Sequence, residues 1–345
     1  MFKRTQPSTA TLRETLRGCE TGRLQSVGYM QVIPLVSQLS DDRFVSPVQI
    51  GADVNTTSYG TLGFKNDSKN VMIVPCHAGY VVKQKAQDHA MAHAGIVSPQ
   101  RQRSYDTAMC IQAAQGGFIR NGDYRMMILP HSLRSKALAI RKKKKYGKLW
   151  NDIADFNRSL GVKAEGHLEY FLKSFKKELD EFVAEFESVP NQIGAIVLID
   201  NRVAGVERAP SHDYWMSIWP SLIRECYGSL AIEYAKTASG TSEQRSNENP
   251  FPQKICSLDE LESIISQIAE QEDERARDTV RKLLDEKLTL SKEETQAGVE
   301  IFTALSENFE GQVINDGQQV VYASLTATKR FMRQQPWQNA AEFSM

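Results

Sequence analysis

The chain has 345 residues, of which 41% are hydrophobic and 24% are charged, and its formal net charge is zero. This is an ordinary globular composition, and a chain of this length buries enough surface to fold without a disulfide or metal staple. Zero net charge excludes a whole-molecule electrostatic attraction to nucleic acid or to membranes.

The cellular compartment is predicted from the apolar runs and the cysteines. No apolar run reaches the ~20 residues that cross a bilayer, and the first eighteen residues lack the apolar core of a secretion signal. The cysteines show no metal-knuckle or redox spacing, which favours reduced thiols; they are Cys19, Cys76, Cys110, Cys226 and Cys256. We therefore expect a soluble, cytoplasmic protein without a membrane partner.

The first half of the chain is predicted to consist mainly of strands. Short β-rich runs bounded by turn residues cover residues 45–54, 58–64, 71–74, 80–82, 108–112 and 125–129. Asn66, Asp67 and Ser68 form a turn signal between two of these runs, so residues 58–74 are predicted to be a hairpin.

The middle of the chain is predicted to be helical. Apolar residues recur every three or four positions over residues 147–160 and 167–187. Residues 194–206 then predict a second hairpin around Asp200 and Asn201, because both residue types tolerate the positive φ of a tight turn. A further helix begins after Ser211 and is expected to bend at Pro220.

The C-terminal third suggests an interrupted return to the core. Residues 237–256 have the composition of a linker, and residues 257–310 are predicted to be a helical insertion with a second helix capped by Ser291 and Glu294. Residues 311–327 contain a strand that returns to the core at residues 28–236, and residues 1–27 and 328–345 are an extension and a tail. The expected fold is α+β, a sandwich-like or mixed β-rich core with packed helices and a helical C-terminal insertion.

Three histidines are the weak candidates for a metal site. If residues 84–93 were helical, His89 and His93 would lie on one face, one turn apart, with His77 upstream. No glutamate stands beside the first histidine, as the zinc-protease pattern requires. We therefore expect no metal and no cofactor, and keep a metal-dependent hydrolase that uses these histidines as an alternative.

A basic run is the only sequence signal for nucleic acid. It consists of Lys142, Lys143, Lys144 and Lys145. Such a run can contact phosphates, but like-charge blocks also occur in solvated loops, and no interleaved aromatic residues offer base stacking. Nucleic acid is therefore an alternative partner that the sequence does not favour.

Several segments together resemble a known family. In chain order they are Lys85-Ala86-Gln87-Asp88-His89, Cys110-Ile111-Gln112, Gln115-Gly116-Gly117-Phe118, Arg134, Trp150, and the hairpin from Gly194-Ala195-Ile196-Val197 to Arg202-Val203-Ala204-Gly205. They resemble the ARG and rhodanese-phosphatase-superfamily-associated protein domain, in which ARG stands for ADP-ribosylglycohydrolase. The likeness runs from about residue 30 to about residue 235.

The chain departs from that family at charged positions. His89 stands where the family tends to have arginine, Gln112 where it has glutamate, and Phe118 follows Gly117 where the family has Gly-Arg-Trp. Each change removes a charge that acid–base or phosphate chemistry would use. The resemblance therefore implies the fold more strongly than an activity.

The favoured hypothesis is a non-enzymatic binding or assembly protein, with a protein partner or self-association, in a phage or bacterial conflict system. The alternative is an enzyme or sensor for a nucleotide or ADP-ribose-like ligand. Its candidate anchors, which the fold would have to bring together, are Gln87, Asp88, His89, Arg134 and Arg202.

Overall fold

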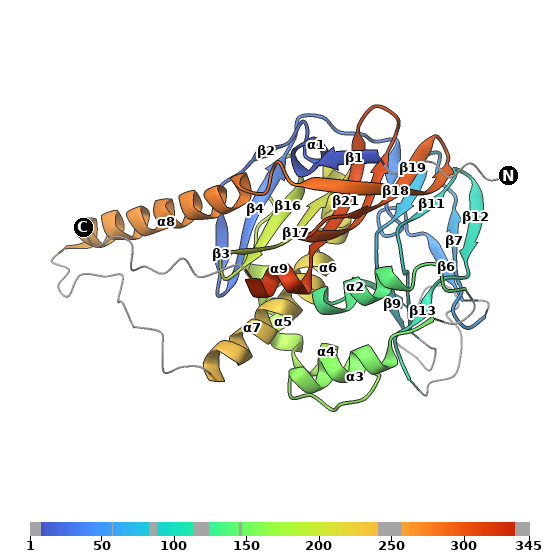
Figure 1. The fold of residues 1–345 in the computed structure, drawn as a ribbon, viewed down its shortest axis with the longest axis horizontal. Coiled ribbons are helices and arrows are strands. Elements are labelled where there is room, and N and C mark those ends of the chain that lie inside the picture. Colours follow the sequence, from blue (N-terminus) through green and yellow to red (C-terminus); the bar gives the residue numbers. More distant parts are fainter. Residues whose placement is uncertain are drawn as a thin grey trace.

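The computed structural model describes residues 8–56, 58–82, 88–113, 124–144, 147–240 and 257–334. Over these residues the protein combines antiparallel and mixed sheets with helices on both faces of the largest sheet (Figure 1). The predicted α+β class is confirmed.

The largest sheet has ten strands, and all its pairings are antiparallel. In order across the sheet they are β1 (Ser8–Thr11), β18 (Lys287–Gln296), β19 (Val299–Leu305), β20 (Phe309–Asn315), β21 (Val320–Ala327), β17 (Arg202–Arg208), β16 (Gln192–Ile199), β4 (Met30–Val36) and β2 (Glu20–Thr21), with β3 (Gln25–Val27) beside β4. Near the C-terminal end of the described chain, β21 pairs with β17.

The predicted hairpin around Asp200 and Asn201 is also confirmed. It joins β16 to β17, and both turn residues have positive φ, 51° and 62°. Two successive positive φ values define the tight turn whose twist matches that of the flanking strands. This turn fixes the register of the two central strands.

Three smaller sheets lie to one side of the large one. They are β14-β9-β10-β13-β15, β11-β8-β5 and β12-β7-β6. Their bounds are β5 (Phe44–Val45), β6 (Asp53–Asn55), β7 (Leu62–Asn66), β8 (Val71–Val74), β9 (Ala78–Val82), β10 (His89–Ala90), β11 (Gly95–Val97), β12 (Arg101–Tyr105), β13 (Met109–Cys110), β14 (Tyr124–Ile128) and β15 (Gly147–Lys148).

Two strand predictions in this region were wrong. The turn after Asn66 exists, but β7 and β8 pair in different sheets, so residues 58–74 are no hairpin. The side chain of Asn66 donates to the carbonyl oxygens of Asn70 (2.8 Å) and Val97 (3.1 Å), which redirects the chain. Residues 45–54 are likewise interrupted by turns between β5 and β6.

One group of helices covers the lower face of the large sheet in Figure 1. It comprises α2 (His131–Ala139), α3 (Trp150–Ser159), α4 (Leu168–Ser174), α5 (Lys176–Glu185), α6 (His212–Ser221), the π-helical segment η1 (Leu222–Tyr227) and α7 (Gly228–Gly240). The predicted helix over 167–187 divides at Phe175, where φ is −114°. Pro220 lies inside α6 and lacks the N–H that an α-helical hydrogen bond needs. The helix changes to π-helical turns at Leu222, two residues after it. The predicted linker starts inside α7, and its residues 241–256 lie outside the described ones.

The opposite face carries α1 (Leu12–Thr15) and the C-terminal part of α8 (Leu258–Arg281), and α9 (Lys329–Gln334) lies near the end of the described chain. Ser257 caps α8 as a helix start, because its side chain accepts the Glu260 N–H at 3.1 Å. The second helix predicted at Ser291 was wrong, since residues 287–305 form β18 and β19 of the large sheet. Leu288 and Leu290 are two residues apart, which is the spacing of apolar residues on one face of a strand. Strand pairing over this segment takes precedence over the local capping pattern at Ser291.

The helical layer supplies a stability prediction. Phe171 is buried, and its ring packs edge-on against Phe156 with centroids 5.0 Å apart. Phe171→Ala should lower the free energy of unfolding by about 3–5 kcal/mol, because the truncation leaves a cavity. The exposed Lys173→Ala on the same helix should change it by less than about 0.5 kcal/mol. Urea denaturation of both variants makes the measurement, and equal midpoints would contradict this packing.

Candidate functional site

Several of the family-like motifs meet at β10 and β13, two neighbouring inner strands of the five-stranded sheet. His89 lies opposite Cys110 in antiparallel register. The Asp88 carbonyl accepts the Ile111 N–H at 3.1 Å, and the indole of Trp150 donates to Cys110 Sγ at 3.3 Å. The structure therefore brings these five motif residues together, whereas Gln87 and residues 115–118 lie outside the described ones.

This motif cluster is enclosed and poor in charge. Cys110 is buried, its thiol donates to the Gln112 carbonyl at 3.0 Å, and burial raises the pKa of the thiol. His89 Nε2 accepts the Gly60 N–H at 3.2 Å, so this nitrogen carries no proton. A thiol with a raised pKa is a weak nucleophile at neutral pH.

The three histidines considered for metal binding face different partners. His89 lies in a strand, so the helical spacing considered for it and His93 does not occur. The Nδ1–H of His93 donates a hydrogen bond to the Ala94 carbonyl at 2.6 Å, and its Nε2 accepts one from the Thr107 hydroxyl at 2.8 Å. Among the described residues, no group of three or more histidine, cysteine or acidic side chains is arranged to hold a metal ion.

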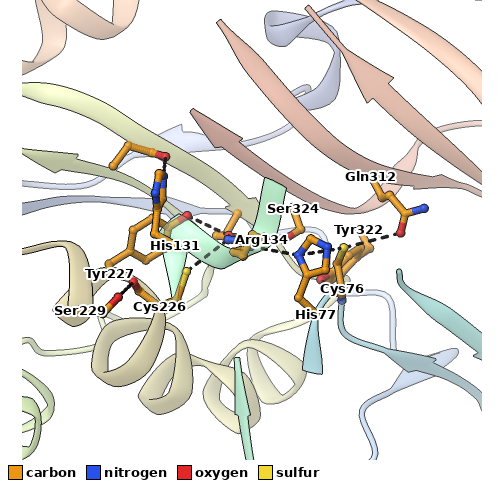
Figure 2. Close-up of polar contacts among 12 residues, drawn as sticks. Cys76, His77, His131, Arg134, Cys226, Tyr227, Ser229, Gln312, Tyr322 and Ser324 are labelled. Atoms are coloured by element: carbon orange, nitrogen blue, oxygen red, sulfur yellow. Dashed lines mark hydrogen bonds and ion pairs between the residues drawn. The ribbon is translucent and has the colours of Figure 1, made fainter. Parts of the chain in front are cut away.

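Arg134 stands at the centre of a second, deeper network, which Figure 2 shows. Its side chain, on α2, is 1% exposed, and it pairs through Nη1 with Glu207 Oε1 on β17 at 2.7 Å. It also donates to His77 Nδ1 at 3.2 Å, to Cys226 Sγ at 3.3 Å and to the Ser324 hydroxyl. These contacts join the helical layer, the large sheet and the loop before β9.

Arg134 remains charged although the Arg134–Glu207 pair is buried. Burial by itself lowers the pKa of Arg134, but the charge of Glu207, together with smaller contributions from Cys226, Tyr227 and Cys76, places the pKa above the ordinary arginine value. Tyr227 donates a further hydrogen bond to Glu207 at 2.8 Å. Gly205 leaves room for that hydroxyl, because a Cβ there would lie 2.1 Å from it.

His77 is held in an unusual conformation beside this pair. It is buried, its φ is +62°, and its Nε2 has no hydrogen-bond partner within the described part of the chain. Burial, and then the charge of Arg134, lower the pKa of His77 well below its usual range. The side chain is therefore neutral, and it accepts from Arg134 instead of binding a cation.

Arg202 does not join Arg134. It donates to the Met332 carbonyl at 3.1 Å and lies over the ring of Tyr234, with 5.9 Å between guanidinium carbon and ring centroid. Glu207 lies five positions further along β17, which is roughly 16 Å at ~3.3 Å per residue. Arg134 is buried and Arg202 is half-buried elsewhere, so these two candidate anchors do not share one site.

Sequence reasoning missed Glu207, although a signal was present. Glu207 follows the apolar run Val203-Ala-Gly-Val206, and an acid after such a run predicts a buried partner of opposite charge.

The basic run that begins at Lys142 has acidic neighbours in the structure. Lys142 lies 3.1 Å from Glu293 and Lys144 lies 3.5 Å from Asp106, while Lys145 lies outside the described residues.

Removing one partner of the buried pair should be costly. Arg134→Ala should lower the free energy of unfolding by about 3–5 kcal/mol, because it leaves Glu207 charged and unpaired in the interior. Arg202→Ala removes an arginine from a half-buried position and should cost less than about 1 kcal/mol. Chemical denaturation compares the two, and an Arg134→Ala protein as stable as the parent would refute the role given to the pair.

The histidines predict loss of stability in acid. Burial lowers the pKa of His131 to about 4, although its hydrogen bond to the Ala204 carbonyl opposes that shift. The unfolded chain, with a histidine pKa of about 6.5, binds more protons between pH ~6.5 and ~4, so this contribution is complete above that window and is lost on acidification. His131→Gln should show a smaller fall in Tm from pH 7 to pH 4.5 than the parent does, by thermal melts in matched buffers. An equal fall would contradict this assignment.

The comparisons with known proteins agree with the motif resemblance. Among the described residues, no helix has the length and apolarity to span a membrane. No curated protein and no solved structure matches the chain. The family described as the ARG and Rhodanese-Phosphatase-superfamily-associated Protein domain matches residues 18–325. Since this match covers nearly the whole chain, the protein belongs to that family.

Proposed function

We propose that this protein is a non-enzymatic binding protein that assembles with a partner through α8. The observation that carries the proposal is the first part of α8, residues 258–274, which extends away from the body of the protein (Figure 1). Within α8 only Ala276 and Val280, near its C-terminal end, are buried. No side chain of the first part is fully buried, although Asp273 near its end accepts the Leu24 N–H at 3.0 Å.

The projecting part has an apolar stripe. Leu258 is 81% exposed and Ile265 is 51% exposed. With Leu261 and Ile268 they recur at spacings of three and four residues, so they lie along one side of the helix. A helix that makes few tertiary contacts is marginally stable in water, and a partner packed on the stripe would stabilise it.

The charge around this stripe indicates the kind of partner. Residues 258–274 contain no lysine or arginine, and their acidic residues are Asp259, Glu260, Glu262, Glu270, Glu272, Asp273 and Glu274. A second copy would bring the same negative charges against them, which is unfavourable. A basic amphipathic helix would match both the stripe and the charge.

The motif cluster supports a function without catalysis. The positions where the family tends to have arginine and glutamate hold His89 and Gln112 here, and the neighbouring Cys110 thiol has a raised pKa. Arg134 is occupied by Glu207. The description of the family as an associated protein domain supports a partner role. We extend the proposal to the conflict-system setting that this association suggests.

A labelled amphipathic peptide of leucine and lysine tests the proposal by fluorescence anisotropy. Ile265→Gln should weaken its binding about tenfold or more, because the apolar contact is lost while helix propensity is nearly kept. Met216→Gln is the matched control, since Met216 is exposed on α6. Binding should also weaken with added salt.

Two results would count against the proposal. One is equal binding of a leucine–glutamate peptide, which would remove the charge argument. The other is a dimer, seen by sedimentation velocity, that dissociates in the Ile265→Gln protein, which would make a second copy the occupant of this face.

A further inference from the structure

A cavity of about 520 Å³ lies on the face of the large sheet that carries α1 and α8. Its walls are α1 with the turn after it, β4, β16 and the C-terminal part of α8. We propose that this cavity binds an organic anion, with a phosphate or carboxylate head held by arginines and an apolar body held by the floor. Its volume lies within the range of small-molecule sites, about 300–1,000 Å³.

The mouth of the cavity is rich in arginine. Arg13, Arg17, Arg277 and Arg281 line it, and Glu14 is the one acidic residue in that lining. Glu14 is engaged elsewhere, because its carboxylate accepts the Thr11 N–H at 2.6 Å in the cap of α1. The lining is therefore cationic, and arginine forks match phosphate and carboxylate oxygens.

These arginines are available to a ligand to different degrees. Arg13 pairs with Asp285, and Arg281 with Asp278, in contacts whose side chains are all exposed. Exposed pairs of this kind contribute little and exchange readily. Arg277 is held by Asp273 at 2.6 Å and by the Gly22 carbonyl at 2.7 Å, whereas Arg17 is exposed and forms no ion pair among the described residues. It is the first residue expected to meet the head of the ligand.

The floor of the cavity is apolar. It is formed by Leu16, Ile33, Leu35, Ile196, Val280 and Leu284. An inorganic ion would leave this surface exposed to water, whereas an anion with an apolar body would cover it at about 25 cal/mol per Å². The floor therefore favours an organic ligand over free phosphate.

A buried arginine next to the cavity is an independent observation, although it does not line the cavity itself. Arg208 is 6% exposed and donates to the carbonyl oxygens of Thr15 (2.8 Å) and Arg17 (2.9 Å) at the end of α1. Within the described part of the chain no acid pairs with it, and its Nε has no hydrogen-bond partner. Its electrostatic neighbour is Cys19, which lines the cavity.

Arg208 differs from the preceding residue, Glu207, in having no partner of opposite charge among the described residues. Neighbouring residues of a strand point to opposite faces of the sheet, and Glu207 points to the α2 face, where Arg134 pairs with it. Arg208 faces α1 with no such partner, and an uncompensated buried charge is destabilising. An anion in the adjacent cavity would compensate it.

The fluorescent probe anilinonaphthalene sulfonate, an aromatic anion, tests the site in the full-length protein. It should bind with increased emission, and Arg17→Glu should weaken that binding about tenfold or more. Arg101→Glu, the same charge reversal at an exposed arginine of β12, should leave it unchanged. Bound probe should also slow alkylation of Cys19, followed by mass spectrometry of its peptide.

Competition distinguishes the sources of the ligand. Displacement by adenosine monophosphate would assign a nucleotide, and displacement by decanoate would assign an acyl chain. Displacement by inorganic phosphate as effective as either would overturn the role of the floor. Probe binding that ignores Arg17→Glu and leaves Cys19 fully reactive would overturn the site. Neither result bears on the first part of α8, because the cavity is lined by its C-terminal part.

Discussion

The Arg134–Glu207 pair is the contact on which the arrangement of the layers depends. Its two charges come from α2 and from β17, and its further hydrogen bonds reach Ser324 on β21, Cys226 in the π-helical segment and His77 before β9. A buried ion pair needs this many partners, because desolvation otherwise exceeds the Coulombic gain. The pair thus ties elements that are distant in the sequence into one arrangement.

Because Arg134 is used in this way, the side chains considered as ligand anchors are separated in space. Asp88 and His89 lie at the start of β10 in the five-stranded sheet, Arg134 lies between α2 and the large sheet, and Arg202 lies at the hairpin of β16 and β17. The two binding features that we propose lie at the surface instead. It consists of an acidic, apolar part of α8 and an arginine-rimmed cavity at the other end of the same helix.

Local signals predicted much of the fold. Asp200 and Asn201 define their turn by residue type alone, and Ser211 marks the start of α6, where its side chain accepts the Tyr214 N–H at 3.3 Å. Predictions failed where pairing over long distances decided the outcome. β7 and β8 were predicted to form one hairpin, but β7 pairs with β12 and β8 pairs with β11. Ser291 does not begin a helix, because its segment pairs with β19 as a strand of the large sheet.

The candidate sites show the same limit. The meeting of His89, Cys110 and Trp150 follows from strand register, which no spacing in the sequence reveals. The opposite surroundings of Glu207 and Arg208 depend on which face of β17 each occupies. Alternation predicts that they differ, but it does not say which of them finds a counter-charge.

The order of strands in the large sheet has a kinetic consequence. The edge strand β1 pairs Ser8 with Leu290, so the first described strand cannot find its neighbour until most of the chain has left the ribosome. Sheets dominated by such distant pairings fold slowly. Until then β17 has the hairpin partner β16 but lacks β21 on its other side. A nascent chain therefore exposes an open sheet edge, which chaperones or a co-translated partner would have to shield from aggregation.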